Sequence, residues 1–425
     1  SLSNGTGTLV SHSHNGATGL AGTISGSVAV AVPGLALSGT LSAEFNQLEA
    51  AVARSLVLDG ETVEVDLRAG EFFTLTGTDL RLAVGDLFNL SGQFTFQQIG
   101  GEDPYLELAI ADASLALNAG GTEVVRATGI EGTAVMTRGP PDDTEIYGSV
   151  SAGVTIDLPG VDLEAGDWLV EFNTAGAVRS ITGGGEQIQL DPGMKVIGED
   201  VALTIAGQSL AAARVSVQEV IHEGETILAL AAEDLAVNLG NGVVTAACDE
   251  AWLIVGEEGV SGVVTLSASI DFPGDGFAAG DVTIQRALLT VNTNTSQVET
   301  GFNAGGDFVS LATPLPAGPY TRVEILDSLQ GAPSTINVGG VVLSGEFSFE
   351  EREQEDGSPI IAIGMADLEV TAEGQTLTDG QGAMVVVSDL NNAAIGGIAG
   401  IASGQLDLGG GDVSLSASIS ARFNE

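Results

Sequence analysis

Carboxylate side chains offer the most abundant chemistry in this chain, namely the binding of a hard cation. Three aspartates each interrupt an apolar run at corresponding places in the sequence, and two acidic pairs lie in predicted hairpin tips. Because calcium takes about six to eight oxygen ligands, these side chains are candidate calcium ligands. The candidates are Asp112, Asp234, Asp367, Glu102, Asp103, Glu355 and Asp356.

Other interpretations of the same carboxylates stay open, because the sequence has no Asp-x-Asp-x-Asp-Gly calcium loop. The acidic pairs are also consistent with solvated loop charge. A charge within an apolar strand can mark a β-bulge or keep an exposed sheet edge from pairing with another chain. Calcium is the one cofactor that the sequence suggests, and no other is expected.

Histidines are the second kind of metal ligand that the sequence offers. The stretch Ser11-His12-Ser13-His14 places two imidazoles on one face of a predicted strand, a spacing that can chelate a metal ion. The alternative interpretation is an exposed polar strand end. The third histidine, His222, lies in a predicted acidic hairpin loop, where we interpret it as solvated.

Catalytic constellations are missing from the sequence. No Gly-x-Ser-x-Gly elbow occurs, and Cys248, the single cysteine, has no histidine close to it along the chain. We expect this thiol to pack as a small buried apolar residue. A polysaccharide-degrading β-helix would need a cleft lined by acids, bases and aromatics, but the chain has only 12 basic residues and 4% aromatics. We therefore expect a protein that is not an enzyme.

Alternation of polar and apolar residues predicts that strands hold these side chains. Residues 63–67 (Val-Glu-Val-Asp-Leu) alternate with a period of two, as half-buried strands do, and many other segments repeat the pattern. Sixty glycines supply tight turns, and hairpins are predicted at Gly207 and at Gly339-Gly340. Helical spacing occurs only in Gln47–Ser55, where it predicts one or two helical turns.

An internal repeat organises these strands. Four dipeptides mark its last strand: Phe45-Asn46, Phe172-Asn173, Val291-Asn292 and Phe423-Asn424. Their first residues are 127, 119 and 132 positions apart (172 − 45, 291 − 172 and 423 − 291). Other anchors recur in the same order, including Leu-Ser-Gly-x-Phe-x-Phe at 90–96 and 343–349. A fixed period of this length predicts a tandem array of modules of single-domain size.

Module boundaries are placed after these dipeptides. Residues 47–173, 174–292 and 293–425 form three complete modules, whereas residues 1–46 match only the back half of one. Either the chain is cut from a longer one, or a neighbouring molecule supplies the missing half. The start at Ser1 rather than Met favours a fragment or a processed product.

The unpaired half-module suggests a mode of assembly. An incomplete sheet can accept a strand or a half-module from another subunit, and such a head-to-tail contact extends into a filament. The residues assigned to this assembly are Gly5, Gly7, Pro33, Gly34, Phe45 and Asn46. The expected fold is thus all-β, with each module either antiparallel β-sandwich-like or an elongated β-structure, stacked into a rod.

Charge and hydropathy narrow the expected partners and location. The chain has 12 basic and 57 acidic residues, and its net charge of −45 repels nucleic acid and anionic lipid. No apolar stretch reaches the roughly 18 to 20 residues of a spanning helix, so membrane insertion is not expected. Abundant carboxylates with a single lysine, Lys195, suit a saline or calcium-rich exterior. We expect an extracellular or cell-surface location.

The repeated elements resemble tandem modules of very large bacterial surface or secreted proteins of the RTX-adhesin-like or giant-adhesin-like kind. The elements are Leu-Ser-Gly-x-Phe-x-Phe, Ala-Gly-Pro-Tyr at 317–320, and Pro-Gly at 33–34, 159–160 and 273–274. The resemblance implies an extended shape, a role in adhesion, biofilm or envelope layers, and no catalytic residues. The Gly-Gly-x-Gly-x-Asp calcium nonapeptide of RTX proteins is missing from this chain.

Two functions follow as hypotheses. The first is an extracellular structural protein that forms a stalk, fibre or surface layer and polymerises by strand or half-module complementation. Its partners would be further copies of itself or neighbouring modules of a longer chain. The alternative is an adhesin arm, stabilised by calcium, whose loops bind glycan or a cell surface.

Overall fold

The computed structural model describes residues 2–424 apart from short segments, and the chain divides into two compact units. Unit 1 comprises Ser1–Ile156 and Asp167–Ile197, and unit 2 comprises Asp157–Gly166 and Gly198–Glu425. The segments outside the described residues are 15–16, 33–34, 59–60, 71, 85–87, 100–104, 120–121, 139–143, 184–185, 223–224, 241, 271–281, 304–305, 339–340, 354–358, 373–374, 388–396 and 411–412. All the regular secondary structure in the described part consists of β-strands, which confirms the all-β prediction.

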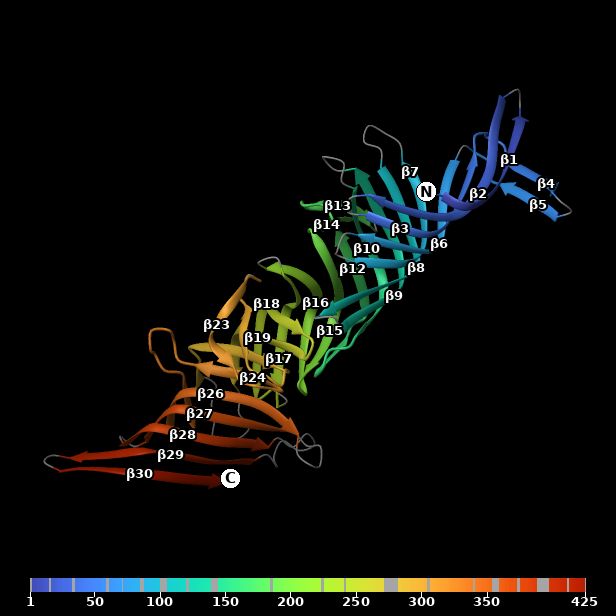
Figure 1. Cartoon of the computed structure of the whole chain (residues 1–425). Coiled ribbons are helices and arrows are strands. Elements are labelled where there is room, and N and C mark those ends of the chain that lie inside the picture. The colour runs from blue at the N-terminus through green and yellow to red at the C-terminus, as the bar shows by residue number, and fades with distance from the viewer. Residues whose placement is uncertain are drawn as a thin grey trace. The chain divides into compact units, whose positions relative to one another are not determined.

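Unit 1 is built around a long antiparallel sheet, coloured blue to green in Figure 1. Its strands pair in the order β1–β2–β3–β6–β7–β8–β9–β10–β12. Their bounds are β1 (Leu2–His14), β2 (Ala17–Val32), β3 (Leu35–Asn46), β6 (Phe72–Val84), β7 (Phe88–Ile99), β8 (Tyr105–Ala119), β9 (Thr122–Arg138), β10 (Thr144–Ile156) and β12 (Asp167–Asn173).

Two hairpins leave this sheet and form separate two-stranded sheets. The first pairs β4 (Val52–Leu58) with β5 (Glu61–Leu67), and the second pairs β13 (Arg179–Gly183) with β14 (Glu186–Leu190). The first hairpin packs through Val52, Val65 and Leu67 in a buried cluster with Ala21 of β2. In the sequence, each hairpin follows a strand of the main sheet. Its own two strands, however, form no backbone pairing with that sheet among the described residues.

The helical turns predicted for Gln47–Ser55 are wrong. Residues 48–50 form bends, and β4 begins at Val52. Leu48 and Val52 have the spacing of one helix face and are both buried, but no helix connects them. Asn46 turns the chain immediately before this segment, and Val52 then joins the hairpin cluster.

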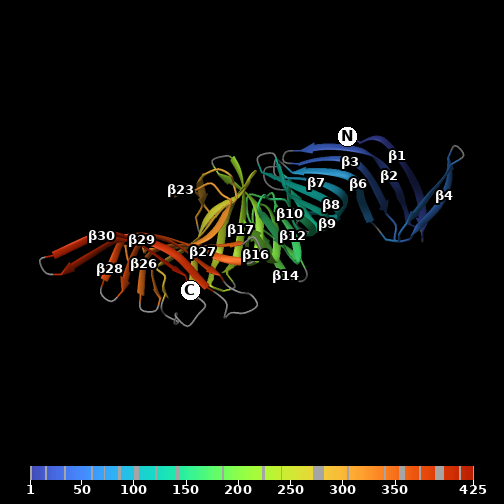
Figure 2. The ribbon, with the colours of Figure 1, turned by 90° about the horizontal axis from the view of Figure 1, so that it is seen from below.

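Long antiparallel strands also make up most of unit 2, and Figure 2 shows the last of them side by side. These strands pair in the order β16–β17–β18–β19–β21–β24–β26–β27–β28–β29–β30. Their bounds are β16 (Gln208–His222), β17 (Glu225–Leu239), β18 (Val244–Gly256), β19 (Gly259–Ile270), β21 (Arg286–Asn292), β24 (Tyr320–Leu326), β26 (Val341–Glu353), β27 (Pro359–Ala372), β28 (Gln375–Val387), β29 (Gly397–Gly410) and β30 (Val413–Asn424).

Shorter strands accompany this sheet. β11 (Val161–Glu164) pairs with the end of β15 (Gly193–Ile205), and β25 (Thr335–Val338) pairs with both β20 (Val282–Thr283) and β26. A third separate hairpin pairs β22 (Val298–Phe302) with β23 (Phe308–Leu315). It follows β21 along the chain, as the other two hairpins follow β3 and β12.

The local predictions on alternation and turns are confirmed. In β5, Val65 and Leu67 are buried while the carboxylates beside them are exposed. Ala206 and Gly207 form the predicted turn between β15 and β16, with φ of 49° and 82°, the left-handed values that two-residue hairpin turns require. β25 and β26 form the other predicted hairpin, although Gly339-Gly340 itself lies outside the described residues.

Candidate functional site

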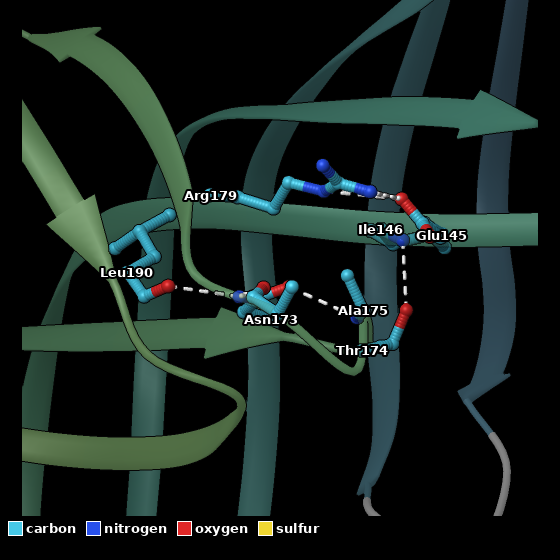
Figure 3. Close-up of polar contacts among 8 residues, drawn as sticks. Glu145, Ile146, Asn173, Thr174, Ala175, Arg179 and Leu190 are labelled. Atoms are coloured by element: carbon cyan, nitrogen blue, oxygen red, sulfur yellow. Dashed lines mark hydrogen bonds and ion pairs between the residues drawn. The ribbon is translucent and has the colours of Figure 1, made fainter. Parts of the chain in front are cut away.

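Asn173, the last residue of β12, is a buried side chain that ties the β13–β14 hairpin to the strand before it (Figure 3). Its Oδ1 accepts a hydrogen bond from the backbone N–H of Ala175 at 2.9 Å, which closes a tight turn. Its Nδ2 donates to the carbonyls of Ala177 and Leu190 at 3.0 and 2.8 Å. Leu190 ends β14, so one amide joins the start and the end of the hairpin.

Two further asparagines make the same set of contacts. Asn46 ends β3 and Asn292 ends β21, and both are buried. In each, Oδ1 accepts from the N–H two residues on, and Nδ2 donates to the carbonyl four residues on and to a carbonyl at the end of the hairpin. The partners are Leu48, Ala50 and Arg68 for Asn46, and Asn294, Ser296 and Pro316 for Asn292.

A second set of polar contacts, also drawn in Figure 3, holds the β13–β14 hairpin against β10. Arg179 of β13 donates to Glu145 of β10 from Nε at 3.1 Å and from Nη2 at 2.5 Å. Thr174 exchanges hydrogen bonds with Ile146, since its N–H donates to the carbonyl and its Oγ1 accepts from the N–H, both at 2.9 Å. These contacts are structural, because each one ties the hairpin to a strand of the sheet.

The residues assigned to assembly from the sequence lie at different places in unit 1. Gly5 and Gly7 are exposed in β1, which pairs with β2 alone among the strand pairings that the structure describes. Phe45 and Asn46 instead lie inside the sheet, because β3 pairs with β2 and β6. Pro33-Gly34 lies outside the described residues. β1 is therefore the element with an open backbone edge.

The edge of unit 1 also exposes apolar side chains. Leu9 of β1 is 59% exposed and Leu20 of β2 is 45% exposed. The opposite end of the strand order in unit 2 is similar, because β30 pairs only with β29 in the described part and Ile419 is exposed there. Long strands with an open edge and exposed apolar side chains are ready to pair with another chain.

The aspartates predicted as ion ligands occupy left-handed backbone positions. Asp112 in β8, Asp234 in β17 and Asp367 in β27 have φ of 48°, 51° and 47°, and all three are exposed. Strand register shifts beside Asp112 and Asp367, as at a β-bulge. Aspartate adopts this backbone more readily than most residues, so the bulge explains the residue type.

The remaining ion-ligand candidates give no cluster. Glu102, Asp103, Glu355 and Asp356 lie outside the described residues. Within the described residues, no group of three or more His, Cys, Asp or Glu side chains is arranged to hold a metal ion. The structure thus places the bulge aspartates on separate strands and does not bring them together.

Substitution of Asp367 distinguishes a role in the β-bulge from a role as an ion ligand. Asp367→Asn is expected to keep the stability unchanged, and Asp367→Ala to lower the free energy of unfolding by about 1 kcal/mol, because alanine disfavours a left-handed backbone. Urea denaturation with and without calcium measures both variants. Glu369→Ala, an exposed neighbour on the same strand, is the control. Loss of a calcium-dependent gain in stability in Asp367→Asn would instead establish an ion ligand.

The histidines and the cysteine offer no reactive site in the described part. The side chains of His12, His14 and His222 lie outside what the structure describes. Cys248 is half-buried rather than buried as expected. Burial, assisted by the carboxylate of Asp249, raises the pKa of this thiol to about 11, so it stays protonated and weakly nucleophilic at neutral pH.

A groove of about 470 Å³ in unit 2 is the strongest candidate for a ligand site. One wall is the face of β21, β24 and β26 that carries Arg286, Thr290, Arg322, Glu324 and Glu346, and the other includes residues 311–316 in and after β23. Alternate positions on β21 and β24 point to the buried core instead. The polar wall is therefore the outer face of the sheet.

Arg322 is held firmly in this groove. Its Nε lies 2.8 Å from Glu324 Oε1 and donates to Thr290 Oγ1 at 3.2 Å. Its guanidinium carbon lies 4.4 Å from the centre of the Tyr320 ring, a cation–π contact. Both described hydrogen-bonding contacts use Nε, so they leave the terminal nitrogens for other partners.

Arg286 is the second guanidinium of the groove, and no ion pair with it is seen among the described residues. Its Nε is buried and has no hydrogen-bond partner among the described residues. Glu346 also lines the groove, and burial raises its pKa above the ordinary value. The nearby carboxylates of Asp327, Asp367 and Glu324 raise this pKa further, whereas the positive charge of Arg286 lowers it. A buried guanidinium N–H without an acceptor is costly and points to a partner other than the described residues.

Sequence inspection missed this groove. Arg286, Leu288 and Thr290 alternate along one strand, and so do Arg322, Glu324 and Leu326 along another. The pattern of charged residues on one strand face was visible, but the pairing of these two strands was not. β21 pairs with β24 across an intervening hairpin, so that Arg286 lies opposite Leu326, 40 positions further on (326 − 286).

The comparisons with known proteins give no information on function. No family model matches the chain, and no curated protein and no solved structure matches it either. None of the described elements is a helix with the length and apolar character needed to span a membrane.

Proposed function

We propose that this chain is a structural repeat protein of an extracellular stalk, fibre or surface layer, built from tandem β modules that assemble head to tail. The observation that carries the proposal is the buried asparagine with its hairpin, which occurs at Asn46, Asn173 and Asn292 with the same hydrogen bonds each time. These positions coincide with three of the four repeated dipeptides of the sequence. A recurring internal clamp is a feature that a scaffold of stacked repeats requires.

The open edges support head-to-tail assembly. β1 and β30 are long strands with one paired neighbour each among the described strands. In the proposed repeat, Asn4-Gly5-Thr6-Gly7 of β1 corresponds to Asp379-Gly380-Gln381-Gly382 of β28, a strand that has neighbours on both sides. Among the described pairings, β1 therefore has one neighbour where its counterpart has two. Strand addition from a second copy would supply that partner.

Removal of the N-terminal strands tests the assembly. Deleting residues 1–46 is expected to convert polymers into monomers in sedimentation velocity and negative-stain electron microscopy. The residues removed include β1 and its open edge. Unit 2 should keep its thermal transition, because its strands pair among themselves. Polymers that persist at wild-type length after the deletion would contradict the proposal.

A gentler variant guards against misfolding of unit 1, since the deletion also removes the Asn46 clamp. Leu9→Lys places a charge on the edge strand at a side chain that is already 59% exposed, so folding should be unaffected. Leu329→Lys, at an 80% exposed side chain in unit 2, is the matched control. Depolymerisation by the first substitution and not by the second is the expected result.

A further inference from the structure

The groove beside β23 combines features that a structural surface does not need. Its lining includes two of the chain's 12 basic residues, Arg286 and Arg322, and two glutamates, Glu324 and Glu346. Its volume of about 470 Å³ lies within the usual range for sites that bind small molecules. The formal charges of the lining balance, so a preference for an anion depends on how each guanidinium group is paired.

The charges in the groove are compensated unequally. Arg322 is paired with Glu324 and hydrogen-bonded to Thr290, so its position is fixed and its charge is largely balanced. Arg286 forms no ion pair among the described residues, and its buried Nε has no acceptor. The partner missing from the groove is therefore a negatively charged oxygen acceptor near Arg286, with Arg322 as a rigid neighbour.

We propose that this groove binds the carboxylate of a small hydroxylated acid, the chemistry that an acidic sugar presents, with Arg286 as its principal ligand. Guanidinium groups bind carboxylates through paired, charge-assisted hydrogen bonds. Glu346 and Glu324 supply acceptors on the same wall for the hydroxyl groups of the ligand. The apolar side chains of Leu288, Leu311 and Leu326 bound the remaining space.

The sequence around the other two buried asparagines supports a role particular to this groove. Arg286 and Thr290 lie six and two residues before Asn292. The positions six and two residues before Asn173 are Asp167 and Glu171, and those before Asn46 are Thr40 and Glu44. A purely structural arginine would be expected at each clamp, whereas this one occurs once. The inference does not depend on head-to-tail assembly.

Titration calorimetry with the full chain tests the proposal, with sodium glucuronate as the probe, glucose as its uncharged analogue and acetate as a carboxylate without hydroxyl groups. Glucuronate is expected to bind at least about tenfold more tightly than either. Arg286→Met, which keeps an unbranched apolar stem but removes the guanidinium donors, is expected to weaken glucuronate binding by about tenfold or more. Arg126→Met, at an exposed arginine paired with Glu123 in unit 1, should change it by less than about twofold.

A second variant separates loss of binding from loss of fold. Ala312→Trp places a bulky ring at an exposed position of the opposite wall and should block the groove without touching either arginine. Both variants should keep the wild-type melting temperature. The proposal is overturned if glucuronate does not bind, if glucose or acetate binds equally well, or if Arg126→Met weakens binding as much as Arg286→Met does.

Discussion

Replacing Asn173 with alanine is expected to lower the free energy of unfolding by about 3 kcal/mol and to release the β13–β14 hairpin. The substitution removes three hydrogen bonds from a side chain that is 1% exposed. Each buried backbone group left without a partner costs about 1 to 3 kcal/mol unless the hairpin moves to let water in. Either response destabilises the folded state, so the effect should exceed that of an ordinary surface substitution.

Local and global readouts together identify the clamp. Urea denaturation measures the loss of stability, and amide hydrogen exchange followed by mass spectrometry should show faster exchange in residues 179–190. The ion pair between Arg179 and Glu145 remains in the variant, so the hairpin should loosen rather than unfold completely. Equal exchange in variant and wild type would show that the amide does not hold the hairpin.

Two matched substitutions sharpen this result. Asn173→Asp keeps the acceptor for Ala175 but places a carboxylate against the carbonyls of Ala177 and Leu190, so it should destabilise at least as much as alanine. Asn238→Ala, at an exposed position of β17, should change stability by less than about 0.5 kcal/mol. The contrast between the two alanine substitutions measures the contribution of the clamp.

Short-range patterns in the sequence predicted the strands because a period of two leaves little choice of structure. The buried Val65 and Leu67 and the turn at Ala206-Gly207 follow from neighbours within a few residues. The prediction for Gln47–Ser55 was wrong for the same reason. Leu48 and Val52 have helical spacing, but Asn46 and the hairpin determine where they lie.

Contacts between distant residues account for what the sequence did not reveal. The Phe-Asn dipeptide was recognised as a marker, but the role of its amide depends on a carbonyl at the far end of a hairpin. That carbonyl lies 22, 17 and 24 residues on for Asn46, Asn173 and Asn292. Because the hairpins differ in length, no fixed spacing predicts the contact. The groove could not be predicted from the sequence for a similar reason, since β21 and β24 pair across the β22–β23 hairpin.

Gly345→Ala is expected to be the second strongly destabilising substitution, with a loss of about 3 kcal/mol in the free energy of unfolding. Gly345 has a φ of 145°, which side chains rarely allow. An added Cβ would lie 2.8 Å from the carbonyl oxygens of both Ala366 and Asp367. These are backbone atoms of the bulge in β27, so no side-chain rotation relieves the overlap, and the strands must separate.

The same logic explains the repeated Leu-Ser-Gly-x-Phe-x-Phe motif. Gly92 in the first copy lies against β8, where an added Cβ would be 2.5 Å from Ala113 Cα, beside the bulge at Asp112. Both glycines therefore allow a neighbouring strand to carry its left-handed aspartate. Gly92→Ala should destabilise unit 1 as Gly345→Ala destabilises unit 2. Gly166→Ala, with no atom within 4 Å of the added Cβ, is the control and should be neutral.

Displacement of Gly345 should also change the shape of the groove. Its N–H donates to the carbonyl of Ser334 at 3.0 Å, and its neighbour Glu346 lines the groove with Arg286. Movement of β26 away from β27 would shift Glu346, so Gly345→Ala is expected to weaken glucuronate binding as well as stability. Gly92→Ala, in the other unit, should lower stability and leave glucuronate binding unchanged. If Gly345→Ala melts like wild type, the close strand approach at the bulge is not the reason for the glycine.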